Sequence, residues 1–112
     1  IRGGENISPR EVEDALHVHP AIHEAAVVAM PHPRMGETGC AYLVLNEGAE
    51  LAFDDLIAFL GETGMAKQKY PERIEIIEAF PRTAAGKIRK NLLRDEIAGK
   101  VAKEAADKGA TP

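Results

Sequence analysis

An apolar run at residues 22–30 does most to limit how this chain can fold. The run is rich in Ala and Val and lies between Pro20 and Pro31. Proline pushes the residue before it out of the helical region and lacks a backbone donor, so the interval leaves no room for a full amphipathic helix. Short, continuous apolar runs are typical of strands that are buried on both faces. We therefore expect residues 22–30 to form the central strand of a sheet.

The segments that follow this run supply its partner strands. Residues 31–37 contain two prolines and a glycine, which predicts a loop. The apolar residues at 40–45 then predict a second strand that pairs with the first. Alternating apolar and charged residues at 73–78 indicate a third, half-exposed strand.

Three helices are expected from apolar residues at helical spacing. The first begins at Pro9, because Ser8 is a favourable N-cap and Glu11 can return to the cap backbone, which makes a capping box. The second covers residues 53–60, and the third covers residues 88–97.

These elements predict one α+β domain. It is a small two-layer structure with a sheet of about three strands, a short N-terminal hairpin or strand, and three packing helices. With 112 residues, of which 45% are apolar, the chain has room for one modest core. We expect the domain to cover residues 1–98. Residues 99–112 contain almost no large apolar side chain, which predicts a frayed helix or a disordered tail.

Charge and hydropathy limit the classes of function. No apolar stretch is long enough to span a bilayer, and a net charge of -4 argues against a nucleic-acid surface. The chain starts without Met or a signal-peptide layout, so we expect a fragment of a cytoplasmic protein. The single cysteine, Cys40, lies in an apolar run and is expected to be buried. No metal site is expected, because nothing completes a zinc ligand set with the histidines at positions 17, 19, 23 and 32.

A basic stretch near the end of the chain suits a small anionic ligand. Residues 82–94 hold five basic side chains and no acidic one. The Gly-Lys pair within the stretch is not a P-loop, because Pro81 occupies the position of the first glycine and Ile88 that of the hydroxyl residue. The glycines at residues 3–4 lack the third glycine of a dinucleotide fingerprint.

The same stretch resembles a known family. Residues 80–93 read Phe-Pro-Arg-Thr-Ala-Ala-Gly-Lys-Ile-Arg-Lys-Asn-Leu-Leu. This run resembles the closing motif of the adenylate-forming superfamily, which includes acyl-CoA synthetases, luciferases and the adenylation domains of peptide synthetases. The matching positions are Pro81, Thr83, Gly86, Lys87 and Leu92. Gly-Gly-Glu-Asn-Ile at residues 3–7 is similar to the loop after the hinge in the acyl-CoA synthetase branch, and residues 28–37 and 69–71 also resemble that branch.

The resemblance implies that the chain is the mobile C-terminal lid of an AMP-forming acyl-CoA synthetase of fatty acid metabolism. A carboxylic acid and ATP would give acyl-AMP, and CoA would then form the thioester. Lys87 would be the catalytic cation, while a large N-terminal domain absent from this chain would hold most of the ATP, Mg²⁺ and acyl site, so the fragment alone would be inactive. The residues expected beside the CoA channel are Gly3, Gly4 and Glu5. The residues expected to support the lysine are Pro81, Thr83 and Gly86.

Two alternatives stay open. The chain resembles the lid of a peptide-synthetase adenylation domain as well, where a carrier protein replaces CoA. The order of elements also fits a ferredoxin-like interaction module, although residues 1–7 are short and glycine-rich for its first strand. The cations that are candidates for contact with CoA phosphates or the large domain are Arg82, Arg89, Lys90, Lys67 and Lys69.

Overall fold

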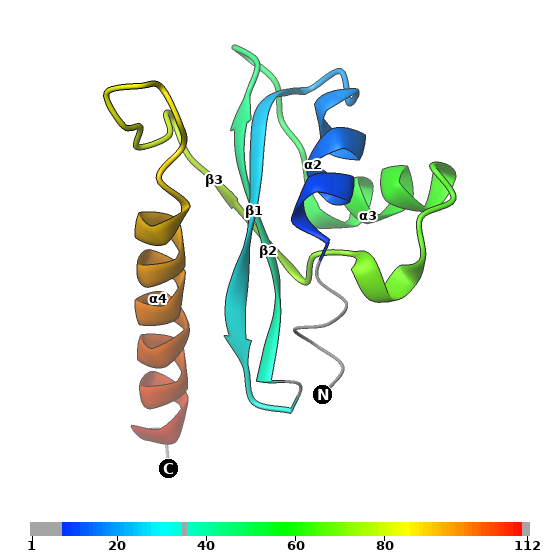
Figure 1. Cartoon of the computed structure of the whole chain (residues 1–112). Helices are drawn as coiled ribbons and strands as arrows, with labels where there is room; N and C mark the ends of the chain where they lie inside the picture. Colours follow the sequence, from blue (N-terminus) through cyan, green and yellow to red (C-terminus); the bar gives the residue numbers. More distant parts are fainter. Residues whose placement is uncertain (1–7, 35, 111–112) are drawn as a thin grey trace.

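The computed structural model describes residues 8–34 and 36–110, which form a three-stranded mixed sheet with helices on both faces (Figure 1). The elements, in chain order, are α2 (Pro9–His17), β1 (Ile22–His32), β2 (Gly36–Leu45), α3 (Phe53–Glu62), the 3-10 turn η1 (Lys67–Lys69), β3 (Arg73–Ile76) and α4 (Lys90–Ala110). The predicted α+β fold with three strands and three helices is confirmed. The expected N-terminal hairpin or strand falls on residues 1–7, which lie outside the described part of the chain.

The sheet has the order β1-β2-β3, so β2 is its central strand. β1 and β2 form an antiparallel hairpin from the pair Ile22 and Leu45 to the pair His32 and Gly36, and β3 lies parallel to β2. The expectation that residues 22–30 form the central strand is therefore wrong. β1 lies at an edge, but helices cover both of its faces, and this burial explains its continuous apolar run.

Side chains of α2 cover the free edge of β1. The Ala25 N–H donates to Nε2 of His17 at 3.3 Å, and the Val27 N–H donates to Oε2 of Glu13 at 2.7 Å. These contacts satisfy backbone donors that an exposed edge strand would otherwise offer to another chain. The predicted capping box at the start of α2 is wrong, because Ser8 stands at the N-cap without a side-chain cap hydrogen bond.

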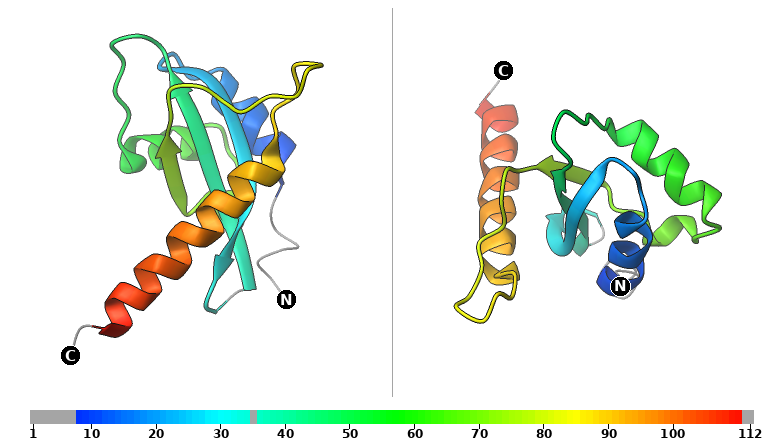
Figure 2. Two further views of the ribbon diagram at one scale, coloured as in Figure 1. Left: turned by 90° about the vertical axis from the view of Figure 1, so that its left-hand side faces the viewer. Right: turned by 90° about the horizontal axis from the view of Figure 1, so that it is seen from above.

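Alternating residues of the sheet build two separate cores, one on each face. On one face, Val27 and Leu43 pack with buried side chains of α2 and α3. On the other face, Val28 and Tyr42 pack with Ile97 of α4. Figure 2 shows α4 alone on its side of the sheet, with α2 and α3 on the opposite side. The helices thus add a third layer to the two that were expected.

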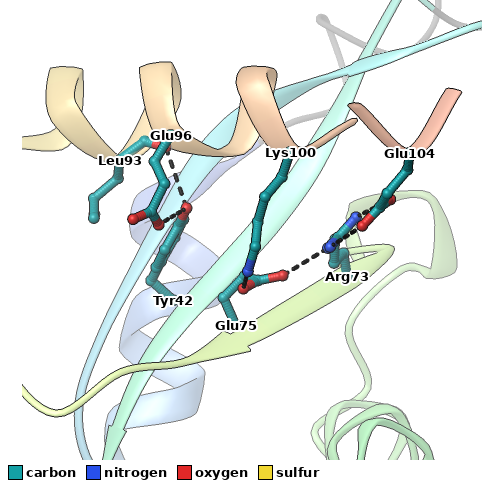
Figure 3. Close-up of polar contacts among 7 residues, drawn as sticks. All are labelled: Tyr42, Arg73, Glu75, Leu93, Glu96, Lys100 and Glu104. Atoms are coloured by element: carbon teal, nitrogen blue, oxygen red, sulfur yellow. Dashed lines mark hydrogen bonds and ion pairs between the residues drawn. The ribbon is translucent and has the colours of Figure 1, made fainter. Parts of the chain in front are cut away.

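Tyr42 joins the centre of β2 to α4 by a buried hydroxyl (Figure 3). The hydroxyl donates to Oε1 of Glu96 at 2.8 Å and lies 3.3 Å from the carbonyl oxygen of Leu93. Burial, and then the hydrogen bond to Glu96, raise the pKa of Tyr42, so the phenol stays protonated and keeps its role as a donor.

α4 continues past Gly99 to Ala110, further than the frayed or disordered tail that composition predicted. Charged side chains of β3 account for the extension, as Figure 3 shows. Arg73 pairs with Glu104 through two hydrogen bonds of 2.8 and 2.7 Å, and Lys100 pairs with Glu75. Arg73 also donates to Glu75 at 2.8 Å, so these four residues form a network that clamps the second half of α4 to the sheet.

Replacement of Glu75 by Gln should lower the free energy of unfolding of this chain by about 1 to 2 kcal/mol at pH 7, because a neutral amide holds the two cations less strongly. Burial raises the pKa of the Glu75 carboxyl, but hydrogen bonds from Lys100 and Arg73 outweigh burial and hold it below its ordinary value of 4.5. The stability that Glu75 contributes is therefore present above the unfolded-state pKa and is lost as the pH falls through the folded-state pKa.

Urea unfolding at several pH values tests this prediction, since the difference between parent and variant should vanish in strong acid. The same change at the exposed Glu78 should alter the free energy of unfolding by less than about 0.5 kcal/mol. Equal losses in the two variants would show that the network does not hold α4.

Candidate functional site

The basic stretch folds into a hairpin between β3 and α4, here called the lysine loop (residues 81–89). Arg82 and Ile88 face each other in an antiparallel bridge, and the Arg89 N–H donates to the Pro81 carbonyl at 2.8 Å. The loop appears in yellow in Figure 2, where it projects beyond the first turn of α4. A protruding hairpin of this kind presents its tip to whatever lies outside the domain.

Backbone hydrogen bonds shape the tip of the lysine loop. The Thr83 N–H donates to the Lys87 carbonyl at 2.8 Å, and the Gly86 N–H donates to the Thr83 carbonyl at 2.9 Å. Gly86 has a φ of 90°, which is favourable only for glycine, at the position where three-residue hairpin loops need a left-handed residue. The Lys87 N–H donates to Oγ1 of Thr83 at 3.2 Å. The structure thus brings Thr83, Gly86 and Lys87 together.

Two residues attach the lysine loop to the core. Phe80, just before the loop, is 7% exposed and belongs to the core under α4, and Ile88 packs against the same core. Pro81 accepts the hydrogen bond that closes the base of the hairpin. The loop therefore has a fixed base and an exposed tip.

Ion pairs within the domain engage two of the five cations of the basic stretch. Arg82 pairs with Glu24 of β1, and Lys90 pairs with Glu13 of α2 at 2.6 Å. The Lys87 side chain is exposed, and no hydrogen bond or ion pair within residues 8–34 and 36–110 engages its ammonium. Arg82 and Lys90 are thus neutralised by the domain, while Lys87 is available to an external anion.

The electrostatic setting of Lys87 favours a negatively charged ligand. The loop leads directly into the N-terminus of α4, which is the positive end of the helix dipole. The first turn of α4 has no acidic side chain, and the exposed Arg89 and Arg94 lie on either side of it. This end of the domain is therefore positive although the chain as a whole has a net charge of -4.

The acidic partners of the loop had no signal in the sequence. Glu24 lies 58 residues from Arg82, and neither its spacing nor its neighbours mark it as a partner. Of the other cations that were candidates for ligand contact, Lys69 pairs with Glu11 at 2.8 Å, whereas Arg89 and Lys67 are exposed. The predicted channel residues Gly3, Gly4 and Glu5 lie outside the described part of the chain.

The remaining reactive side chains have structural contacts. Cys40 is fully buried, and burial raises the pKa of its thiol to about 12, so the nucleophilic thiolate does not form near neutral pH. Three histidines accept backbone N–H groups through a ring nitrogen: His17, His19 and His32. No three His, Cys, Asp or Glu side chains of the described residues gather as a metal site. In the same ranges, no helix is long and apolar enough to cross a membrane.

Comparison with known proteins gives consistent matches. The model of the family described as AMP-binding enzyme C-terminal domain matches residues 11–87. Over 98 residues the chain is 54% identical to the medium-chain fatty-acid–CoA ligase of Escherichia coli K12. The matched region covers 87% of this chain and 17% of that protein. The chain is 44% identical over 100 residues to the 2,3-dihydroxybenzoate-AMP ligase of Bacillus subtilis 168, covering 89% of this chain and 18% of that protein.

Solved structures agree with these relatives. A Mycobacterium tuberculosis fatty acyl CoA synthetase superimposes with a TM-score of 0.79 and 33% identity, over 89% of this chain and 20% of that chain. ATP-bound MatB from Rhodopseudomonas palustris superimposes with a TM-score of 0.77 and 29% identity, over 82% of this chain and 18% of that chain. The chain spans about a fifth of the length of the proteins that it matches.

Replacement of Gly86 by Ala should lower the free energy of unfolding by about 1 to 2 kcal/mol, because an L-residue is strained at a φ of 90° even where space is open. Gly99 is the matched control, since it is also surrounded by open space but lies inside α4. Gly99→Ala should raise the free energy of unfolding by about 0.5 to 1 kcal/mol. Urea unfolding measures both changes, and equal signs for the two variants would contradict the left-handed role of Gly86.

Proposed function

This chain belongs to the family of AMP-binding enzyme C-terminal domains, and from that premise we propose that it is the mobile lid of an AMP-forming acyl-CoA synthetase. The whole enzyme activates a carboxylic acid with ATP and transfers the acyl group to CoA. One observation carries the proposal: Lys87 stands at the tip of an ordered, projecting hairpin, its ammonium is engaged by no other described residue, and Arg82 and Lys90 are paired within the domain. Such a lysine is suited to enter a site on another domain.

Lys87 acts in the first half-reaction. A carboxylate oxygen attacks the α-phosphorus of ATP, a bond to that phosphorus forms, and the bond to pyrophosphate breaks. Nucleophile and phosphate are both anionic, so a fixed ammonium between them lowers the barrier by offsetting their repulsion as the bond forms. The long, flexible side chain of lysine can deliver this compact charge from a lid into a pocket on the large domain.

The second half-reaction needs the lid in another orientation. The CoA thiol attacks the acyl carbon, the thioester bond forms, and AMP leaves. We propose that Gly3, Gly4 and Glu5 border the CoA channel in this orientation, because the two glycines let an extended chain pass close to the backbone. The lid therefore rotates between two poses, each of which presents a different edge to the same pocket.

The other components belong to the whole enzyme. The described residues of the lid bring no metal ligand set together, so we assign Mg²⁺, most of the ATP contacts and the acyl pocket to the large N-terminal domain. The isolated lid is inactive for the same reason. We place the enzyme in the cytoplasm, where ATP and CoA are supplied, and in the metabolism of fatty acids.

CoA is favoured over a carrier protein as the acyl acceptor. The chain shares 54% identity with a relative named as a CoA ligase and 44% with one named as an AMP ligase. Release of AMP that depends on CoA alone, with the full-length enzyme, would support this choice. A requirement for a phosphopantetheinylated carrier protein would favour the peptide-synthetase alternative.

Lys87→Ala in the full-length enzyme should slow acyl-AMP formation by about 100- to 1000-fold, because one preorganised electrostatic contact to the transition state is lost. Exchange of pyrophosphate into ATP measures this step. Thioester formation from supplied acyl-AMP should keep the parent rate. Lys103→Ala removes another exposed ammonium, from α4, and should leave both rates unchanged. Parent-like exchange in Lys87→Ala would overturn the assignment.

Gly4→Leu should give the opposite pattern. A branched side chain in a backbone-lined channel obstructs the arm of CoA, so thioester formation should fall by at least about tenfold while pyrophosphate exchange continues. The same two assays measure both steps. Loss of the exchange activity instead would show that Gly4 serves the fold of the lid and not the CoA channel.

A further inference from the structure

The peptide unit between Gly86 and Lys87 is held at both of its polar atoms. The Gly86 carbonyl accepts a hydrogen bond from Nη1 of Arg82 at 2.8 Å. The Lys87 N–H donates to Oγ1 of Thr83 at 3.2 Å. Rotation of this one peptide would swing the Cα–Cβ bond of Lys87, so the two contacts together set the direction in which the lysine leaves the loop.

Such contacts are needed because steric clashes restrict the backbone only weakly at Gly86. Gly86 has no Cβ, its φ is 90°, and a Cβ built there would meet no atom within 4 Å. Glycine leaves the backbone more freedom than any other residue, so neither packing nor dihedral preference fixes the following peptide. Backbone hydrogen bonds to Thr83 hold the Gly86 N–H and the Lys87 carbonyl on either side of the peptide, and side-chain hydrogen bonds hold the two polar atoms of the peptide itself.

Arg82 connects this peptide to the sheet. While Nη1 contacts Gly86, Nη2 pairs with the carboxylate of Glu24 on β1, within the body of the domain. A planar guanidinium can hold two partners in fixed directions, which the single ammonium of a lysine does less well. A continuous path therefore runs from β1 through Glu24 and Arg82 to the residue before Lys87.

We propose that Arg82 is a positioning residue for Lys87 and that Glu24 anchors Arg82 in that role. The inference rests on the proposed function, since it concerns how Lys87 reaches the anionic centre. Folding stability is a weaker explanation, because the Arg82 and Glu24 side chains are 38% and 33% exposed, and exposed ion pairs contribute little to stability. Direct contact of Arg82 with a phosphate is the competing role, in which Glu24 would compete with the phosphate for the guanidinium.

The test compares Arg82→Gln and Glu24→Ala with the parent in the full-length enzyme. Each variant should lower kcat for pyrophosphate exchange by about tenfold, because a small displacement of a catalytic group is costly. The KM for ATP should stay within about twofold, since binding of the nucleotide is not altered. The double variant should be no slower than Arg82→Gln alone, because Glu24 acts through Arg82.

Matched controls separate positioning from charge and from folding. Arg10→Gln removes the same charge at an exposed position of α2, and Glu37→Ala makes the same change at an exposed position of β2. Both should keep the parent kcat. Thioester formation from supplied acyl-AMP should also keep the parent rate in Arg82→Gln and Glu24→Ala, which shows that the lid is folded.

The competing role gives the opposite result at Glu24. If Arg82 contacted a phosphate directly, Glu24→Ala would leave pyrophosphate exchange unchanged or faster, and Arg82→Lys would restore most of the parent rate. Either outcome, or parent-like kcat in both Arg82→Gln and Glu24→Ala, would overturn the inference. Lys87→Ala, assayed alongside, distinguishes failure of this inference from failure of the proposed function. If Lys87→Ala also retains exchange, the proposed function itself fails.

Discussion

The alternation of side chains along β2 is the constraint on which the rest of the domain depends. Leu43 faces α2 and α3, whereas Cys40 and Tyr42 face α4, and all three are fully buried. A strand that is buried on both faces cannot slip by one residue without moving each side chain into the opposite core. The register of β2 therefore fixes which helix lies on which face, and hence where the chain between β3 and α4 crosses the end of the sheet.

The sequence predicted the helices and strands better than it predicted which of them lie side by side. The apolar run at residues 22–30 showed that β1 is covered on both faces, but coverage by helices does not distinguish an edge strand from a central one. The extension of α4 was missed for a related reason. Composition measures the apolar surface of a helix, whereas Lys100 and Glu104 are held by charged residues of β3 that lie far away in the chain.

The residues of the candidate site also fall into those that the sequence could indicate and those that only the fold reveals. Thr83 and Gly86 were expected to support Lys87 from the resemblance to the family motif, and both lie close to Lys87 in one local hairpin. Glu24 and Glu13 could not be predicted, since the fold alone brings β1 and α2 to the base of the lysine loop. A basic stretch in a sequence records how many cations are present, and only tertiary contacts decide which of them are neutralised.

That division of charge suits the proposed role of the domain as a moving lid. A cation that is paired within its own domain offers little to an external anion, because breaking the pair offsets much of the new attraction. Arg82 and Lys90 are paired on either side of Lys87, so they can hold the loop without competing strongly for the ligand. In that role Lys87 would have no partner among the described residues to give up when the lid closes. Its contribution can therefore be confined to the one pose in which an anion lies within its reach.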